Sequence, residues 1–414
     1  MRLRCGSVQP EQLRRRAGTG NDSANTTGTS LTMKLTDCHN IDDVRRLAKQ
    51  RLPWPVFDYI DGAADDELTK ARNTAAYASA DLVPDVLAGV ATIDTSCTIL
   101  GRKSALPLIL SPTALQRAFH WQGERAVARA AEKFGVWCGI SSLATVSIEE
   151  IGALISTPKM FQLYVHKDKG LNRSMIQRCQ AAKFDAIALT VDTIVAGKRE
   201  RCARSGFTSP PKFTARNLLG YAMKPRWGLD YVFREKFALP NLDTHVREGT
   251  GEAVSIAGYF NTMLDQSMDW AVAEQIRNDW GGKFALKGVM SVADARRAVE
   301  IGADAIMISN HGGRQLDGSR APFDQLTEIV DAVGGKIEII CDGGVRRGTH
   351  ALKALCAGAT TASGGRLYLY ALAAAGQDGV ERALAILQDE IERGMKLMGV
   401  TSVDQLTSDR LRWR

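Results

Sequence analysis

The 414-residue sequence lacks the features that mark membrane-spanning and disulfide-held proteins. Its central uncharged stretch, residues 134–148, is short and rich in Gly, Ser and Thr, so it cannot span a bilayer as a helix. The N-terminus has no apolar core of a signal peptide. The eight cysteines include no C-x-x-C pair, and several lie in apolar runs, which indicates a reducing compartment. We therefore expect a cytoplasmic protein.

The sequence also disfavours a metal site on a helix and nucleic-acid binding. No two of the six histidines are three or four residues apart, so no helical metal site is predicted. The net charge is +7, but residues 1–34 hold six basic and two acidic residues, a local +4, so the rest of the chain carries only +3. A basic surplus concentrated in a tail does not indicate nucleic-acid binding.

The first residues differ in composition from the remainder. Residues 18–30, GTGNDSANTTGTS, are polar and of low complexity, which predicts disorder. Met33 stands just before the first patterned segment and can serve as an alternative start. We expect a disordered basic tail over 1–34 that the native protein can lack, one domain over 35–406, and a C-terminal tail over 407–414.

From about residue 40, short apolar runs alternate with amphipathic helical patterns. Residues 41–52 and 55–73 have helical spacing and predict an N-terminal helical segment. Eight segments are predicted as strands: 106–112, 136–142, 160–165, 186–192, 283–289, 305–313, 338–344 and 360–366. Helical patterns such as 123–135, 291–303 and 348–359 lie between them. This alternation predicts a parallel sheet closed into a (β/α)8 TIM barrel, and no G-x-G-x-x-G turn supports an open doubly wound sheet.

A long insertion, residues 200–268, separates the fourth and fifth predicted strands and is too long for a plain strand-to-helix connection. Basic and aromatic side chains alternate within 224–237. One interpretation is a lid whose aromatic residues pack on the barrel. The other is a patch that rests on an anionic membrane surface. The residues by themselves favour the lid slightly.

The most informative motif is SNHGGRQLDG (309–318), directly after an apolar strand. His311 can act as a base near neutral pH, and Arg314 can hold a carboxylate. A histidine satisfied in a turn is the plainer interpretation, but it leaves the two glycines and the strand-end position unexplained. Asp192, at the end of another strand, can orient the imidazole, although by itself it also fits a helix cap. Arg199 is a second candidate for a carboxylate.

Glycine-rich segments end the last two predicted strands, DGGVRRG (342–348) and GGR (364–366). With helix N-termini and arginines, such loops form the usual phosphate site of this barrel class, although they also fit ordinary turns. Lys287 can stabilise a developing anion. Without a dinucleotide fingerprint, a flavin mononucleotide is a more natural redox partner than a nicotinamide dinucleotide.

These motifs resemble those of the FMN-dependent α-hydroxy acid dehydrogenase/oxidase family, over residues 35–406. SNHGGRQLD is highly specific to that family. Further support comes from FDY (57–59), FQLYV (161–165), TVD (190–192), KGV (287–289) and DGGVRRG. The resemblance implies a (β/α)8 barrel, FMN as cofactor, and a homo-oligomer, often a tetramer.

The resemblance also implies roles for individual residues. For catalysis and substrate binding they are His311 as base, Asp192 as its partner, Arg199 and Arg314 for the substrate carboxylate, Tyr59 and Tyr164 near its hydroxyl and carboxylate, and Lys287 at the flavin N1/O2 edge. For the cofactor they are Pro112, Thr113, Ala114, Ser141, Gln162, Thr190, Lys287, Ser309, Asp342, Gly343, Gly344, Arg346, Gly365 and Arg366.

Within the family, two features point to dehydrogenases that use L-lactate. Leu143 stands where glycolate oxidases carry a Trp, and the insertion with its PRW resembles that of membrane-associated members. The expected reaction is L-lactate to pyruvate, with electrons passed to a quinone or cytochrome, at the inner face of the cell membrane. Ala114 instead suits an oxidase that reduces O2 to H2O2. A non-redox phosphate-binding barrel is the alternative from another class.

Two departures from the family pattern concern local stability and phosphate affinity. His350 replaces an acid at a predicted helix start, where negative charge would suit the helix dipole. The last predicted strand, TTASGG, lacks apolar residues, and Leu367 stands where many oxidases have Pro. Because these departures leave His311, Asp192 and Arg314 in place, we expect an active enzyme rather than a degenerate binding protein.

Overall fold

Eight parallel strands form a closed barrel in the computed structural model, which describes residues 33–207, 215–235, 237–242 and 256–414. In chain order the strands are β4 (Leu108–Thr113), β5 (Trp137–Ser141), β6 (Lys159–Leu163), β7 (Ala186–Thr190), β8 (Lys283–Val289), β9 (Ala305–Ser309), β10 (Glu338–Asp342) and β11 (Thr361–Gly364). Each strand pairs with the next, and β11 pairs back onto β4, for example Ser363 with Ile109. The predicted barrel and its eight strands are confirmed.

The barrel core is made of side chains that point inward from the strands. Trp137, Met160, Met307 and Ile340 are fully buried there, among small alanines. A hairpin of β2 (Cys97–Ile99) and β3 (Arg102–Ser104) precedes the barrel, and its Ile99 joins the same cluster. The polar strand β11 fits because its hydroxyls are satisfied. Ser363, for example, hydrogen-bonds to Ser111 of β4.

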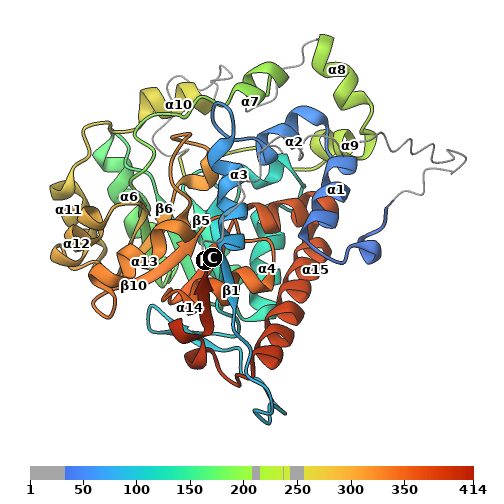
Figure 1. The fold of residues 1–414 in the computed structure, drawn as a ribbon. Coiled ribbons are helices and arrows are strands. Elements are labelled where there is room, and N and C mark those ends of the chain that lie inside the picture. Colours follow the sequence, from blue (N-terminus) through green and yellow to red (C-terminus); the bar gives the residue numbers. More distant parts are fainter. Residues whose placement is uncertain (1–32, 208–214, 236, 243–255) are drawn as a thin grey trace, which may run out of the picture. The chain divides into compact units, whose positions relative to one another are not determined.

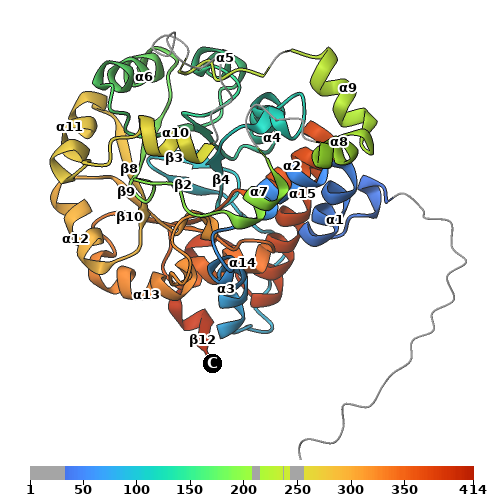
Figure 2. The ribbon, with the colours of Figure 1, turned by 90° about the horizontal axis from the view of Figure 1, so that it is seen from above.

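Helices surround the strands, as Figure 2 shows. They are α4 (Glu124–Phe134), α5 (Ile148–Leu154), α6 (Lys169–Ala181), α11 (Trp270–Trp280), α12 (Val292–Glu300), α13 (Pro322–Val333), α14 (Gly348–Cys356) and α15 (Arg366–Met398). In α4, Ala126, Val127, Ala130 and Ala131 are buried at helical spacing, and Gly135 ends the helix in the left-handed conformation. Such amphipathic helices pack their apolar face on the outside of the barrel. The ends of the strands are then covered only by the loops that connect strands to helices.

The N-terminal helical segment consists of α1 (Ile41–Arg51), α2 (Trp54–Asp61) and α3 (Leu68–Ala75). Asn40 caps α1, which lies against α15 in Figure 1. The prediction of one continuous helical pattern over 55–73 is wrong. The chain leaves the helix at Gly62, and Glu67 has a left-handed φ of 61° just before α3.

The prediction that residues 407–414 form a tail separate from the domain is also wrong. Leu411–Trp413 form β12, which pairs antiparallel with β1 (Ala80–Leu82). Leu411 is buried, and Trp413 lies 5.2 Å from the ring of Phe323. The alternation of apolar and basic residues in this short stretch is a strand pattern that needed β1 as a partner to be recognised.

The insertion contains α7 (Glu200–Ser205), α8 (Ala215–Ala222), α9 (Pro225–Phe233) and α10 (Ile256–Met263), and parts of it lie outside the described residues. Figure 1 shows α8 and α9 beside α2. Trp227 packs between Tyr221 and Tyr231 and donates to the Ala118 carbonyl at 2.9 Å, as the lid interpretation expects. No helix among the described residues is long and apolar enough to cross a membrane.

Candidate active site

All the predicted site residues lie at the C-terminal ends of barrel strands or in the segments that follow them, except Tyr59, which lies in α2. This is the end of a (β/α)8 barrel where catalytic residues are found. The residues come from strands far apart in the sequence, so only closure of the barrel brings them together. Among the described residues, no group of three or more His, Cys, Asp or Glu side chains has the geometry of a metal site.

The predicted base meets its predicted partner at these strand ends. His311 Nδ1 lies 3.0 Å from Asp192 Oδ1, and the Thr193 hydroxyl donates to the same carboxylate oxygen at 2.8 Å. On the other side of the ring, His311 Nε2 lies 3.5 Å from the Tyr164 hydroxyl. The carboxylate therefore orients the imidazole through one nitrogen and directs the other toward Tyr164, where it can accept a proton.

The environment sets the protonation of this pair. Burial lowers the pKa of His311, and Asp192 opposes that shift without cancelling it. Burial would raise the pKa of Asp192, but His311 and Lys287 hold it below its ordinary value. At pH 7 the pair is therefore a neutral imidazole beside an ionised carboxylate. This is the state that a general base needs.

Two arginines lie near the ring of Tyr59. The guanidinium carbon of Arg314 is 4.6 Å from the ring centroid, and that of Arg199 is 5.9 Å away. Neither forms an ion pair with a carboxylate in the described part of the chain, and the buried Nε of Arg199 has no hydrogen-bond partner there. Burial, and then the charge of Arg314, lowers the pKa of Arg199. Two guanidinium groups without a carboxylate partner among the described residues suit an anion, above all a planar carboxylate.

A buried ion pair connects β8 to β10 below these groups. Lys287 Nζ lies 2.9 Å from Asp342 Oδ2 and donates to Ser309 Oγ at 3.0 Å. Burial would raise the pKa of Asp342, but Lys287 and the hydroxyls of Ser111 and Ser309 lower it to about 2. Burial by itself lowers the pKa of Lys287, yet Asp342 and Asp192 raise it above its ordinary value. The ammonium is therefore charged and fixed in place.

Two buried polar atoms at neighbouring strand ends have no partner within the described chain. Gln162 Oε1 accepts from Ser141 Oγ at 2.7 Å, but Gln162 Nε2 has none, and neither has Thr190 Oγ1. An unsatisfied buried donor costs about 1–3 kcal/mol, so a ligand that pairs with both groups is expected. A planar heterocycle with carbonyl and N–H groups along one edge does so, with Lys287 on the adjacent strand. The residues present therefore fit the ring of FMN.

The predicted phosphate loops follow β10 and β11. Gly343 and Gly344 have φ values of 147° and 73°, and a Cβ on Gly344 would stand 1.9 Å from the Asn73 carbonyl oxygen, so a side chain is excluded. Gly365 directly precedes α15, whose first turn has no side-chain cap. Uncapped backbone N–H groups at such a helix start suit a phosphate. On the neighbouring strand β4, Thr113 is close, because a Cβ on Gly365 would stand 2.9 Å from its side chain.

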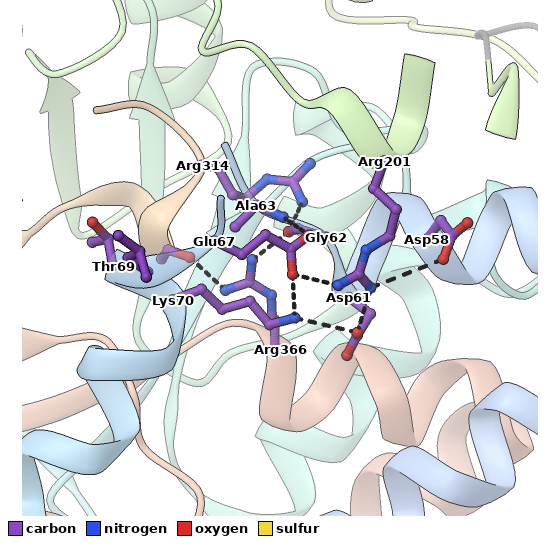
Figure 3. Close-up of polar contacts among 12 residues, drawn as sticks. Asp58, Asp61, Gly62, Ala63, Glu67, Thr69, Lys70, Arg201, Arg314 and Arg366 are labelled. Atoms are coloured by element: carbon purple, nitrogen blue, oxygen red, sulfur yellow. Dashed lines mark hydrogen bonds and ion pairs between the residues drawn. The ribbon is translucent and has the colours of Figure 1, made fainter. Parts of the chain in front are cut away.

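The two predicted phosphate arginines are placed differently. The guanidinium of Arg346 donates to the carbonyl of its neighbour Val345 and lies over the ring of Tyr370, 5.4 Å from the centroid. The guanidinium of Arg366 is turned toward the end of α2, as Figure 3 shows, and donates to backbone carbonyls there. Sequence patterns cannot separate these two orientations, because both arginines follow a glycine-rich strand end.

His350, the departure at the start of α14, is neutral in this fold. Its ring stacks on Tyr77 with centroids 4.3 Å apart and an interplanar angle of 8°. Its Nδ1 accepts from the Arg346 backbone N–H at 3.3 Å, and burial lowers the pKa of His350 to about 4. The histidine therefore supports the phosphate loop by packing and one hydrogen bond rather than by charge.

Sequence reasoning missed several supporting residues. Thr193 and Ser111 each hydrogen-bond to a key carboxylate, those of Asp192 and Asp342. A polar residue inside an apolar strand, as in LILSP, was a usable signal for Ser111. The reciprocal amide pair between Asn73 and Asn310, at 2.7 Å, had no signal because its members are distant in sequence.

The barrel places a candidate base, His311, at the same strand ends as the Gln162, Thr190 and Lys287 groups that fit a flavin ring. This combination is typical of a flavoenzyme. A family model described as FMN-dependent dehydrogenase matches residues 48–413. An L-lactate dehydrogenase of Alcaligenes faecalis is 40% identical over 370 residues, which are 89% of this chain and 97% of that protein. The chain belongs to the FMN-dependent dehydrogenase family, its cofactor is FMN, and its activity is FMN-dependent oxidation of a hydroxy acid.

Other relatives differ in substrate and electron acceptor. An L-lactate oxidase of Nostoc sp. is 38% identical over 90% of this chain and 97% of its own length. Among solved structures, a monotopic membrane protein, (S)-mandelate dehydrogenase, has a TM-score of 0.86 at 32% identity and covers 91% of this chain and 100% of its own. Family membership therefore leaves the particular hydroxy acid and the acceptor to be proposed.

Proposed function

We propose that the protein oxidises L-lactate to pyruvate with FMN and passes the electrons to a quinone or cytochrome. The observation that carries the proposal is the placement of a neutral, carboxylate-oriented His311 near two arginines, Arg199 and Arg314, that have no carboxylate partner among the described residues. A base and a carboxylate site side by side suit a small acid that loses hydrogen from the adjacent carbon. The supporting resemblance is to L-lactate dehydrogenases at about 40% identity.

Each group of the chain has a stated task in this reaction. Arg199 and Arg314 bind the substrate carboxylate, and Tyr164 orients its hydroxyl near His311. His311 Nε2 accepts a proton, and Asp192 stabilises the imidazolium that forms. Bound FMN supplies the two-electron acceptor. Lys287 provides a buried positive charge that favours negative charge on the ring edge.

The cofactor would be held along the strand ends by the residues already described. Its ring would lie against Pro112, Thr113, Ala114, Ser141, Gln162, Thr190 and Lys287, with Ser309 close by. Its ribityl phosphate would lie toward Asp342, Gly343, Gly344, Arg346, Gly365 and Arg366. A homotetramer, which the resemblance implies, remains a prediction that sedimentation measurements would check.

The proposed function is tested by one anaerobic titration. The purified protein is expected to be yellow, to lose its visible absorbance when L-lactate is added without air, and to recover it slowly when air is admitted. A quinone analogue should restore the colour much faster than O2 does. Fast recovery in air would establish an oxidase instead. A protein that stays colourless with added FMN would contradict the flavin assignment and favour a non-redox phosphate-binding barrel.

We also propose that the face of α8 and α9 opposite Trp227 rests on an anionic membrane surface. Leu229, Val232 and Phe233 are 56–78% exposed on α9, and Lys224 and Arg234 flank that helix. Exposed apolar side chains beside basic ones are typical of interfacial helices. The likeness to a monotopic mandelate dehydrogenase supports this placement at the inner face of the cell membrane.

Vesicle sedimentation checks this contact. Binding to vesicles with anionic phosphatidylglycerol is expected to weaken as salt rises, and to weaken strongly in a Leu229→Gln/Phe233→Gln double variant. Leu397→Gln is a matched control, because Leu397 is 70% exposed at the end of α15, outside the insertion. Equal binding by the double variant and wild type would contradict the proposed contact.

A further inference from the structure

A pocket lies between the insertion and the side of the barrel. Its volume is about 140 Å³, close to the roughly 150 Å³ that holds a benzene ring in a protein interior. Its walls come from the segment after β4, from the end of α1, from α9 and from α15, and Figures 1 and 2 show these helices gathered at one side of the barrel. The residues expected to bind FMN and the hydroxy acid do not line it.

Aromatic side chains form much of the lining. They are Phe119 and Trp121 from the segment after β4, and Trp227 and Tyr231 from α9. Trp121 is 36% exposed, although Arg234 lies over its ring, with the guanidinium carbon 4.5 Å from the centroid. A lining of rings favours a flat ligand with a conjugated ring over a sugar or an aliphatic chain.

One buried donor in this lining is incompletely paired. Arg117 follows β4, and its side chain is 3% exposed. Its Nη1 lies 3.2 Å from the Glu235 carboxylate, and its other terminal nitrogen donates to the Glu235 carbonyl, but Nε has no hydrogen-bond partner among the described residues. A buried N–H without an acceptor costs free energy, which a ligand with a carbonyl oxygen would recover. The pocket therefore combines a ring-sized space with a charged donor in its wall.

Two stacked rings connect the pocket wall to the substrate site. Phe119 is 2% exposed and packs on Tyr59, with ring centroids 6.0 Å apart and an interplanar angle of 27°. The ring of Tyr59 also lies under Arg314, one of the two arginines proposed for the substrate carboxylate. A ligand in the pocket would therefore lie beside the place where the hydroxy acid is oxidised, without competing with it.

The helix α9 connects the pocket to the exposed apolar surface. Trp227 and Tyr231 face the pocket, whereas Val232 and Phe233 are 68% and 78% exposed. One side of α9 thus forms a wall of the pocket, and the other side is the face proposed to rest on the membrane. A lipid-soluble ligand held at this membrane surface would have a single helix between it and the pocket.

We propose that this pocket binds the ring of a quinone, with the Arg117 Nε–H donating to a quinone carbonyl. The proposal rests on the proposed function, of which it names the electron acceptor and the acceptor's site. In the overall reaction the hydroxy acid loses two electrons and two protons, from its C–H and O–H bonds, and becomes a keto acid. The quinone gains the same two electrons and two protons and becomes a hydroquinone, so no other reactant is needed.

Binding is measured without turnover, by equilibrium dialysis of a ubiquinone with a single isoprene unit against the oxidised, FMN-loaded protein. Wild type is expected to bind one molecule of this short-chain ubiquinone per chain. Arg117→Lys keeps the positive charge beside Glu235 but removes the Nε–H, so the dissociation constant should rise about 10-fold or more. Trp121→Leu should raise it about 2- to 10-fold, by loss of one ring contact.

Ala374→Leu fills the pocket instead of removing a contact, and it decides the question if Arg117→Lys does not fold. Ala374 lines the pocket from α15 and is 6% exposed. A leucine there would take up space that the quinone ring needs, so binding of the short-chain ubiquinone should weaken by about 10-fold or more. Trp413→Leu is the matched control for Trp121→Leu, because Trp413 is 46% exposed in β12 and does not line the pocket. It should bind the short-chain ubiquinone as wild type does.

Stopped-flow kinetics separate the two halves of the reaction. Flavin reduction by L-lactate reports on the hydroxy acid site, and flavin reoxidation reports on the acceptor. In Arg117→Lys and Ala374→Leu, the ratio of the reoxidation rate with the short-chain ubiquinone to that with ferricyanide should fall about 10-fold, because ferricyanide has no ring that needs the pocket. Trp413→Leu should leave this ratio at the wild-type value.

Equal binding of the short-chain ubiquinone by wild type, Arg117→Lys and Ala374→Leu would overturn the proposal, and so would the absence of binding to wild type. Binding of dihexanoyl phosphatidylglycerol in place of the quinone would identify a site for a lipid headgroup and would overturn it as well. If L-lactate does not reduce the flavin, the proposed function has failed, and the dialysis still tests the pocket. If L-lactate reduces the flavin but the quinone does not bind, only the assignment of the pocket has failed.

Discussion

Replacing His311 with glutamine is expected to lower turnover with L-lactate by about 10²- to 10⁴-fold while FMN stays bound. Glutamine keeps much of the volume and polarity of the ring but cannot accept and carry a proton. His311 lies beside Asp192, at 3.0 Å, and Tyr164, at 3.5 Å, rather than in the ring-sized set of donors, so the flavin spectrum should be retained. Stopped-flow reduction of the bound flavin measures the effect directly.

The pH dependence follows from the same geometry. The charged and titrating groups facing His311 are Asp192, Lys287, Arg199 and the Tyr164 hydroxyl. Only the neutral imidazole can act as base, so kcat/KM should rise with pH through the pKa of His311. Because burial lowers that pKa, the midpoint of the rise should lie below the ordinary histidine value, about 6.5. A pH profile that tracked an unshifted histidine would contradict the assignment.

Two further variants separate the contributions of Asp192 and Thr193 to the function of His311. Asp192→Asn removes the charge that raises the pKa of His311, so the acid limb should move to lower pH even as turnover falls. Thr193→Val removes one hydroxyl from the pair and leaves both titrating groups in place, and it should cost no more than about tenfold. Unchanged turnover in His311→Gln, measured beside these variants, would refute the base.

The sequence was most informative where local pattern and barrel geometry agree. The apolar run 305–309 followed by SNHGGR identified both a strand and the base at its end, because a parallel barrel places strand ends at one opening. Asp192 could be paired with His311 in the same way. The roles of polar side chains at strand ends can therefore be predicted from the sequence before the fold is known.

The sequence did not reveal contacts between residues that are distant in the chain and belong to no recognisable motif. The break between α2 and α3 and the pairing of β12 with β1 both depend on neighbours that sequence spacing does not show. The carbonyls that accept hydrogen bonds from Arg366 could not be foreseen either, since backbone carbonyls have no sequence signature. The same holds for the ion cluster around Asp61.

Asp61→Asn is expected to be the most destabilising single change outside the barrel core. The Asp61 carboxylate is 2% exposed and accepts hydrogen bonds from four side chains: Arg45, Lys70, Arg201 and Tyr370. These residues come from α1, α3, α7 and α15, and the ion pairs of Lys70 and Arg201 are drawn in Figure 3. Removing the one fully buried carboxylate leaves Arg45 without an ion-pair partner and Lys70 and Arg201 with Glu67 as their nearest carboxylate, and it costs about 3 kcal/mol, the lower end for breaking a buried pair.

The measurement is the melting temperature of the FMN-loaded protein at matched cofactor concentration, which should fall by roughly 5–10 °C at pH 7. Burial by itself would raise the pKa of Asp61, but the hydrogen bond from Arg45 and the charge of Lys70 hold it well below its ordinary value. A group whose folded pKa is depressed stabilises the fold above its unfolded pKa, about 3.9, and loses that contribution as pH falls further. The gap between wild type and Asp61→Asn should therefore narrow below about pH 4.

Asp58→Asn makes the same chemical change three residues earlier in α2 and serves as the control. Asp58 lies 3.9 Å from Arg201 and is 24% exposed, and burial raises the pKa of its carboxyl group, so its charge is disfavoured by folding. The variant should melt at the wild-type temperature or slightly above. If the two asparagine variants lost equal stability, α2 would be sensitive to any change. A loss confined to Asp61→Asn would identify its carboxylate as the charge that ties the N-terminal helices and α7 to α15, and hence positions Tyr59 and the segment that begins at Arg199.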